Sequence, residues 1–111
     1  NVLLVGNANG ALQHWHVTSG KCLHTIFDDK NQFYALDYQA SGDRFAAAGK
    51  EAVVKVYDED TRQLVQTLRG SYGYGPQGES GHSNRIFSLK WDPEDPTCVV
   101  SGGWDNTVQI W

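Results

Sequence analysis

The chain has 111 residues and a mass of 12.3 kDa, and its 40% apolar and 20% charged residues are typical of a folded globular domain, not a disordered segment. Nine Lys and Arg against 13 Asp and Glu give a net charge of −4, which disfavours a surface for nucleic acid or for an anionic membrane. No apolar run approaches the roughly 18–20 residues of a membrane-spanning helix, so we expect a soluble domain with no membrane partner.

Turns rich in Gly, Asn, Asp and Ser divide the chain into short segments of strand character. Val, Ile, Tyr, Phe and Trp recur within these segments, and none shows the periodicity of a helix over about 10–12 residues. In chain order the predicted strands are 2–7, 11–17, 21–27, 33–39, 44–50, 52–58, 64–68, 86–92, 97–103 and 107–111. The sequence therefore predicts an all-β fold.

An internal repeat organises these strands. The stretch 46–57 aligns with 100–111 without a gap, and 4–15 aligns with both. Each stretch ends on an aromatic residue, at Trp15, Tyr57 and Trp111, with spacings of 42 and 54 residues. The Gly-rich stretch 70–81 lengthens the second spacing. A period near 40–45 residues with four strands per unit is the pattern of β-propeller blades.

Residues 81–111, GHSNRIFSLKWDPEDPTCVVSGGWDNTVQIW, carry the most specific pattern. Gly81-His82 and the run SGGWDNTVQIW resemble a Trp-Asp repeat of the WD-repeat β-propeller family. The resemblance is weaker over 1–69. It implies blades of four-stranded antiparallel sheets in a partial propeller, about two and a half blades of a longer one.

The resemblance also implies where the blades begin and end. Residues 1–31 are expected to form a partial blade (strands b, c and d), and 32–69 a complete blade. Residues 70–81 are expected to form a Gly-rich insertion loop between blades, and 82–111 a partial blade (strands a, b and c).

In this family a buried hydrogen-bond relay ties each blade together, and the matching positions here are His82, Ser101, Asp105 and Trp111. Each member would satisfy a polar group that is otherwise buried without a partner. The other two repeats depart from the pattern at the positions of Ser101, Asp105 and Trp111. The second repeat has Ala47, Glu51 and Tyr57 at these positions, and the first has Val5, Asn9 and Trp15. Their stability is expected to depend more on apolar packing, by Leu3, Leu4, Leu36, Phe45, Val54 and Val56.

A Ser-His-Asp set also composes a hydrolase triad. Ser101, however, lies within a strand after two valines, with no nucleophile elbow. A second enzyme hypothesis places an active site in the central channel. The two innermost strands offer only Asp37, Lys90 and Asp92 for it. We therefore expect no catalytic residues, no cofactor and no small-molecule substrate. RNA binding is a weaker alternative that the net negative charge disfavours.

The potential metal ligands are sparse. Cys22 and Cys98 lie 76 residues apart in apolar runs, so we expect both to be buried and reduced. His14 and His16 would share one side of a strand, but a third ligand is missing nearby in the sequence, and no metal site is expected. The acidic groups fall in predicted turns, where Asp caps backbone N–H groups: Asp28-Asp29, Asp58-Glu59-Asp60, and Asp92, Glu94 and Asp95.

Propellers of this family resemble discs whose faces bind proteins, with the loops between blades and the turn between second and third strands on one face. Here that face would receive aromatic and basic side chains, a composition enriched at interface hot spots. The candidate partner-binding residues are Gln32, Lys50, Tyr72, Tyr74, Arg85 and Trp104. The opposite face would be acidic.

The leading hypothesis is therefore a non-catalytic scaffold that binds other proteins in a multiprotein complex. A cytoplasmic location is expected. A large cytoskeletal or ciliary assembly is compatible with the family, and a nuclear location stays open.

Overall fold

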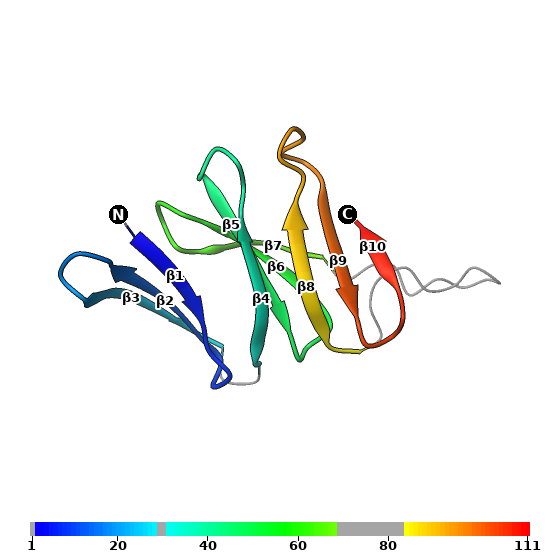
Figure 1. Cartoon of the computed structure of the whole chain (residues 1–111), viewed down its shortest axis with the longest axis horizontal. Helices are drawn as coiled ribbons and strands as arrows, with labels where there is room; N and C mark the ends of the chain where they lie inside the picture. The colour runs from blue at the N-terminus through cyan, green and yellow to red at the C-terminus, as the bar shows by residue number, and fades with distance from the viewer. Residues whose placement is uncertain (1, 29–30, 69–83) are drawn as a thin grey trace.

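The computed structural model describes residues 2–28, 31–68 and 84–111 (Figure 1). These residues form ten β-strands and no helix, one strand within each predicted segment, which confirms the all-β fold. The strands are β1 (Val2–Gly6), β2 (Ala11–His16), β3 (Lys21–Phe27), β4 (Phe33–Tyr38), β5 (Arg44–Gly49), β6 (Val54–Asp58), β7 (Leu64–Leu68), β8 (Ile86–Trp91), β9 (Val99–Gly103) and β10 (Val108–Ile110). Over the described residues no helix is long and apolar enough to cross a membrane.

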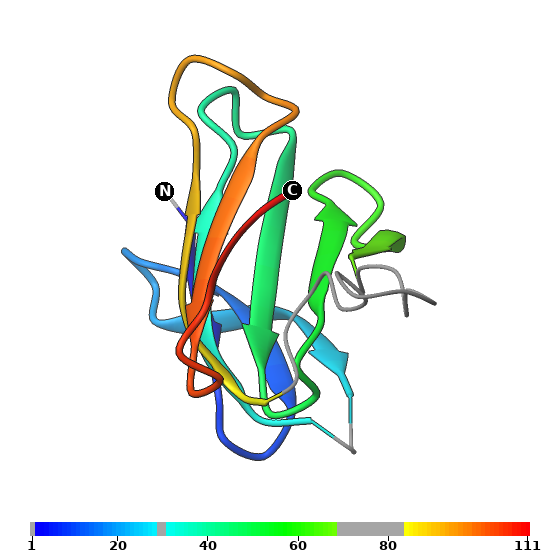
Figure 2. The ribbon, with the colours of Figure 1, turned by 90° about the vertical axis from the view of Figure 1, so that its right-hand side faces the viewer.

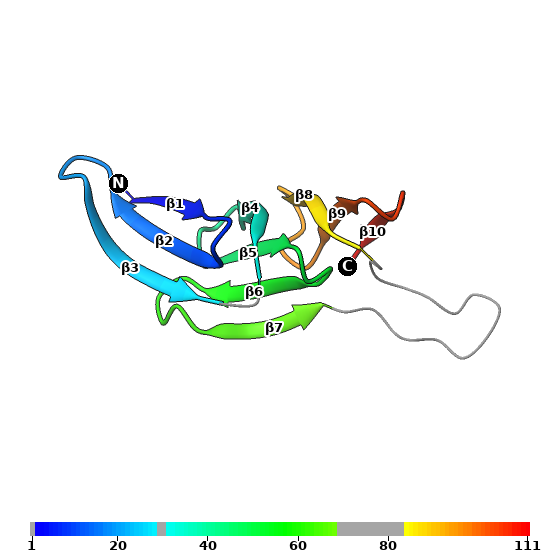
Figure 3. The ribbon, with the colours of Figure 1, turned by 90° about the horizontal axis from the view of Figure 1, so that it is seen from below.

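The strands form three antiparallel sheets, as expected for blades of a partial β-propeller. The first sheet has the order β1-β2-β3, the second β4-β5-β6-β7 and the third β10-β9-β8. Viewed from below, β1, β4 and β8 lie along one side of the array, and β3 and β7 lie along the other (Figure 3). The sheets therefore stand side by side with equivalent strands in equivalent places. The blade boundaries stay a prediction, and 70–81 lies outside the described residues.

The internal repeat is visible in the backbone of one turn. Gly10, Ala52 and Asn106 occupy the same repeat position, and their φ angles are 92°, 63° and 63°. Each lies in the turn that joins the second and third strands of its repeat. A left-handed residue at this point lets the chain reverse tightly between the two strands.

A first apolar core lies between the first and second sheets. Phe45 is fully buried there, and its ring stacks on Tyr57 with centroids 5.2 Å apart. The rest of this core consists of Leu4, Leu12, Phe33 and Ala47. Leu3, predicted to pack in a core, is 56% exposed, because successive strand residues alternate and Leu4 takes the side that faces the second sheet.

A second core lies between the second and third sheets. The second sheet contributes alanines and valines, and the third contributes mostly larger side chains: Ala46, Ala48, Val54 and Val56 pack against Ile86, Leu89, Trp91 and Val99. Two hydrogen bonds join the innermost strands here, because the backbone N–H and indole N–H of Trp91 donate to Asp37 Oδ2 and O at 2.9 and 3.1 Å. Asp37, one of the channel candidates, thus serves as a link between the two sheets.

The prediction that both cysteines are buried was wrong. Cys22 is exposed, Cys98 is half-buried, and neither forms a disulfide. The reason is the position of β3, whose apolar sequence resembles a core strand although it forms the edge of the first sheet in the described structure. No neighbouring strand covers the outer side of β3 there.

Candidate protein-interaction face

Two equivalent β-bulges begin the innermost strands of the second and third sheets. The register of β4 against β5 shifts between Phe33 and Ala35, around Tyr34, and that of β8 against β9 shifts around Phe87. A bulge re-aims the side chain of its extra residue. The rings of Tyr34 and Phe87 stack on each other across the two sheets, with centroids 4.7 Å apart and an interplanar angle of 15°.

Trp104 adds a third ring to this pair. Trp104 lies in the β9–β10 turn, and its backbone N–H donates to Arg85 O, just before β8, at 2.9 Å. Its ring lies 4.7 Å from that of Phe87, and the Arg85 guanidinium lies 5.7 Å from its centroid, within cation–π range. Trp104 is nevertheless 61% exposed.

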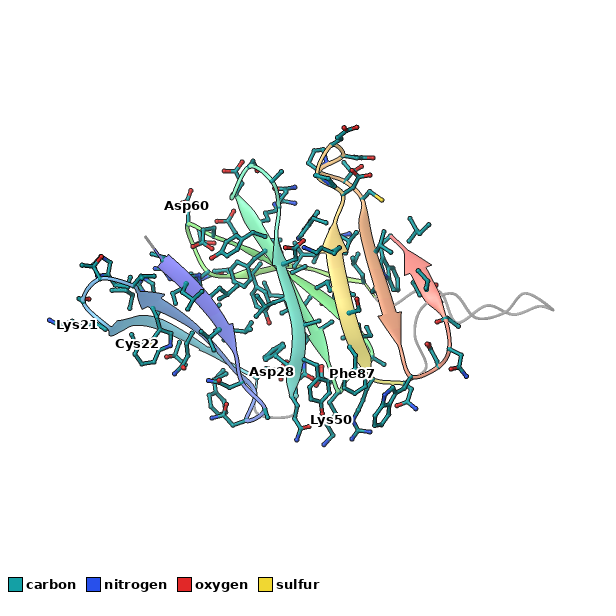
Figure 4. The ribbon with its side chains drawn as sticks, viewed as in Figure 1. Lys21, Cys22, Asp28, Lys50, Asp60 and Phe87 are labelled. Atoms are coloured by element: carbon teal, nitrogen blue, oxygen red, sulfur yellow. The ribbon has the colours of Figure 1, made fainter. Side chains whose placement is uncertain are left out.

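The second sheet repeats this arrangement with different side chains. Lys50 stands at the repeat position of Trp104, and its N–H donates to Gln32 O at 3.0 Å, as Trp104 does to Arg85. The Tyr34 hydroxyl donates to Gln32 Oε1. Lys50 and Phe87 lie at the same lower end of the molecule in Figure 4. We call this set the aromatic face: Gln32, Tyr34, Lys50, Arg85, Phe87 and Trp104.

Four of the predicted partner-binding residues lie on the aromatic face: Gln32, Lys50, Arg85 and Trp104. Tyr72 and Tyr74 lie outside the described residues. Sequence reasoning missed Tyr34 and Phe87, because strict alternation along a strand does not foresee a bulge. One available signal was that each directly follows the first apolar residue of a predicted innermost strand, Phe33 or Ile86.

The aromatic face is cationic. Among the described residues, the Lys50 ammonium and the Arg85 guanidinium have no carboxylate partner, since the ion pairs found there involve only His14 and Lys55. No described carboxylate therefore neutralises either charge.

One bond of the expected relay lies within the described residues. The indole N–H of Trp111 donates to Ser101 Oγ at 2.8 Å, and Ser101 is only 1% exposed. Asp105 Oδ1 accepts from the backbone N–H and the hydroxyl of Thr107. His82 lies outside the described residues, so the relay as a whole stays a prediction.

Comparison with known proteins bears on this C-terminal part most directly. The family model "WD domain, G-beta repeat" matches residues 75–111. Residues 75–111 are a WD repeat. The resemblance carried by Gly81-His82 and SGGWDNTVQIW is thereby confirmed.

WD-repeat relatives also align with the rest of the chain. Autophagy-related protein 16 of Arabidopsis thaliana is 27% identical over 106 residues, which is 96% of this chain and 19% of that protein. WD repeat-containing protein 1 of Bos taurus is 27% identical over 98% of the chain and 16% of that protein. Protein transport protein SEC31 of Yarrowia lipolytica is 26% identical over 100% of the chain and 9% of that protein. The chain thus spans less than a fifth of the length of each.

The second sheet has an ionic cluster where the WD repeat has Ser101 and Asp105. Glu51 stands at the Asp105 position, and its carboxylate contacts Lys55 Nζ at 3.0 Å. Lys55 also donates to Asp28 Oδ2, and the Lys55 and Asp28 side chains are only 14% and 17% exposed. Burial opposes the charge of Lys55, but the hydrogen bonds to Asp28 and Glu51 outweigh it and raise its pKa. We call Asp28, Glu51 and Lys55 the lysine cluster.

The two strand histidines do not share a site. His14 is 2% exposed, and its Nε2 lies 3.2 Å from the Glu59 carboxylate of the second sheet. The Nδ1 of His16 lies 2.7 Å from Ser19 Oγ in the β2–β3 turn. Within residues 2–28, 31–68 and 84–111, no three His, Cys, Asp or Glu side chains are grouped as metal ligands would be.

The opposite end of the molecule carries the acidic turns. The β4–β5 and β8–β9 connections lie together at the top of Figure 2. Hydrogen bonds from the Thr61 and Asp60 backbone lower the pKa of Asp58, and bonds from Thr97 lower that of Asp95. These two carboxylates cap turns, as predicted. Asp28 differs, because it pairs with Lys55, and Asp29 lies outside the described residues.

Replacing Ser101 by alanine is expected to lower the free energy of unfolding of the complete protein by about 1–2 kcal/mol, because the half-buried Trp111 indole loses its acceptor. Urea denaturation measures the change. Ser88→Ala, at an exposed serine of β8, is the matched control and should change stability by less than about 0.5 kcal/mol. Equal effects of the two replacements would refute a structural role for the Trp111–Ser101 bond.

Proposed function

We propose that this WD-repeat chain is a non-catalytic module that binds partner proteins through the aromatic face. WD-repeat proteins are generally non-catalytic scaffolds, and the relatives named above agree with that role. The observation that carries the proposal is Trp104, which is 61% exposed although Phe87 and Arg85 hold its ring in place. A large, positioned aromatic ring beside an arginine is typical of an interface hot spot.

The proposal includes the arrangement of the chain and its location. Residues 1–31 and 82–111 would be partial blades on either side of the complete blade 32–69, with the insertion 70–81 between the second and third, and the partners would belong to a multiprotein complex. The location would be the cytoplasm, in line with two cysteines that form no disulfide, one of them exposed. The enzyme alternative gains no support from Asp37, whose carboxylate already accepts the Trp91 backbone N–H.

Partner capture tests the proposal. Proteins captured by the complete wild-type protein are identified by mass spectrometry, and their affinities for the Trp104→Ala and Arg85→Ala variants are measured. Each replacement should weaken binding by about 1–2 kcal/mol, or roughly 5- to 30-fold, without changing the melting temperature. The matched controls are Asp60→Lys and Glu94→Lys, on exposed acidic turns at the opposite end. Loss of capture in the controls alone would place the interface at the acidic end.

A further inference from the structure

We propose that the aromatic face selects an acidic protein segment in which an apolar side chain is flanked by carboxylates. This inference rests on the proposed function and adds the chemistry of the partner.

Three aromatic rings contact one another on the aromatic face. Tyr34 and Phe87 are stacked nearly parallel, and Phe87 also contacts Trp104, with centroids 4.7 Å apart in both pairs. The Tyr34 and Phe87 rings thus each cover one face of the other, the Phe87 and Trp104 rings are tilted by 39°, and the Arg85 guanidinium lies over the ring of Trp104. Stacked nucleobases and quaternary ammonium groups both need open ring faces. The ring edges of Phe87 and the outer side of Trp104 remain, and these suit an apolar side chain.

Two cationic side chains lie beside these rings. Lys50 lies on the side of the second sheet and Arg85 on the side of the third, and neither has a carboxylate partner among the described residues. Two acidic side chains lie next in sequence to the face, and the contacts found for them are with Lys55 and Thr107, not with Lys50 or Arg85. Glu51 contacts Lys55 at 3.0 Å, and Asp105 accepts two hydrogen bonds from Thr107. The face therefore presents two cations whose charge a partner carboxylate can neutralise.

Charge is distributed unevenly between the two ends of the molecule. The whole chain carries a net charge of −4, and its acidic turns lie at the opposite end. An acidic segment would be repelled from that end and attracted to the aromatic face, which steers its approach. A single-stranded RNA also combines negative charge with stacking groups, but its bases need open ring faces, which the Tyr34–Phe87 stack and the Arg85 guanidinium over Trp104 reduce. RNA is therefore one outcome of the test.

Labelled peptides test this inference by fluorescence anisotropy with the complete protein. The probe is a ten-residue peptide with a central phenylalanine and two glutamates on each side. One control peptide has glutamine in place of glutamate, and another has alanine in place of phenylalanine. Both controls should bind about tenfold more weakly, and raising the salt concentration should weaken only the acidic peptides. Equal affinity for all three peptides, or tighter binding of an oligouridine of similar length, would overturn the inference.

Protein variants locate the binding to this face. Phe87→Ala and Trp104→Ala should each weaken the acidic phenylalanine peptide about tenfold, and Lys50→Gln about threefold. Lys21→Gln is the matched control, because Lys21 is an exposed lysine far from the face (Figure 4), and it should change nothing. Equal losses for Lys50 and Lys21 would overturn the inference. In one further outcome, the captured partners require Trp104 and Arg85 while the protein shows no preference for the acidic peptide. That result would leave the proposed function standing and overturn only the partner chemistry.

Discussion

Replacing Gly49 by alanine is expected to destabilise the complete protein by about 3 kcal/mol, because the new methyl group has no space. A Cβ at Gly49 would lie 1.7 Å from the carbonyl oxygen of Gln32 and 2.8 Å from its carbonyl carbon. Both are backbone atoms, so a rotamer change cannot relieve the clash, and β4 and β5 would have to move apart. The same carbonyl accepts the Lys50 N–H, so the displacement would also disturb the aromatic face.

Gly102→Ala is the matched control for this prediction. A Cβ at Gly102 would meet only Ser88 Cβ, at 3.9 Å, which is an ordinary contact. The equivalent repeat position in the second sheet is already an alanine, the fully buried Ala48. Chemical denaturation should show a change of less than about 0.5 kcal/mol for Gly102→Ala. Similar losses of unfolding free energy for the two variants would show that the close approach of Gln32 to Gly49 is not the cause of the destabilisation.

The strand order and the repeat could be predicted from the sequence because both depend on local signals. Turn residues separate the strands, and the repeat aligns Gly10, Ala52 and Asn106, which all adopt left-handed backbone angles. The apolar residues Leu4, Phe45, Val54 and Val56 were also predicted to be buried, and they are.

The errors concern contacts that alternation alone does not specify. The apolar run of β3 resembles a core strand, yet its residues are mostly exposed because it is an edge. Tyr34 and Phe87 meet only because each lies at a bulge, and a bulge adds a residue that breaks the period-two pattern. Four of the interface candidates could be predicted from loop positions, whereas the two rings that join them depend on packing between sheets.

The lysine cluster also escaped the sequence analysis. The second repeat lacks serine and aspartate at the relay positions, and the sequence predicts only that its stability depends more on apolar packing. In the structure, Glu51 and Lys55 lie four residues apart on either side of a turn, and Asp28 approaches from the preceding connection. The contact between Asp28 and Lys55 spans 27 residues, so no local pattern indicates it.

Replacing Lys55 by methionine is therefore expected to lower the free energy of unfolding by about 2 kcal/mol at neutral pH. The methionine keeps most of the apolar length of the side chain, but Asp28, 17% exposed, is left without its cation. Removing one partner of a fully buried pair costs about 3–5 kcal/mol, and partial exposure reduces that cost. Lys90→Met, at an exposed lysine of β8, is the control and should change stability by less than about 0.5 kcal/mol.

The pH dependence separates loss of charge from loss of packing. Because folding raises the pKa of Lys55, its contribution is fully present below the unfolded value of about 10.4 and is lost as the pH rises through the folded-state pKa. The wild-type protein should therefore lose stability relative to Lys55→Met in that alkaline range. A stability difference that stays constant from neutral to alkaline pH would show that Lys55 acts through its packing and not through the lysine cluster.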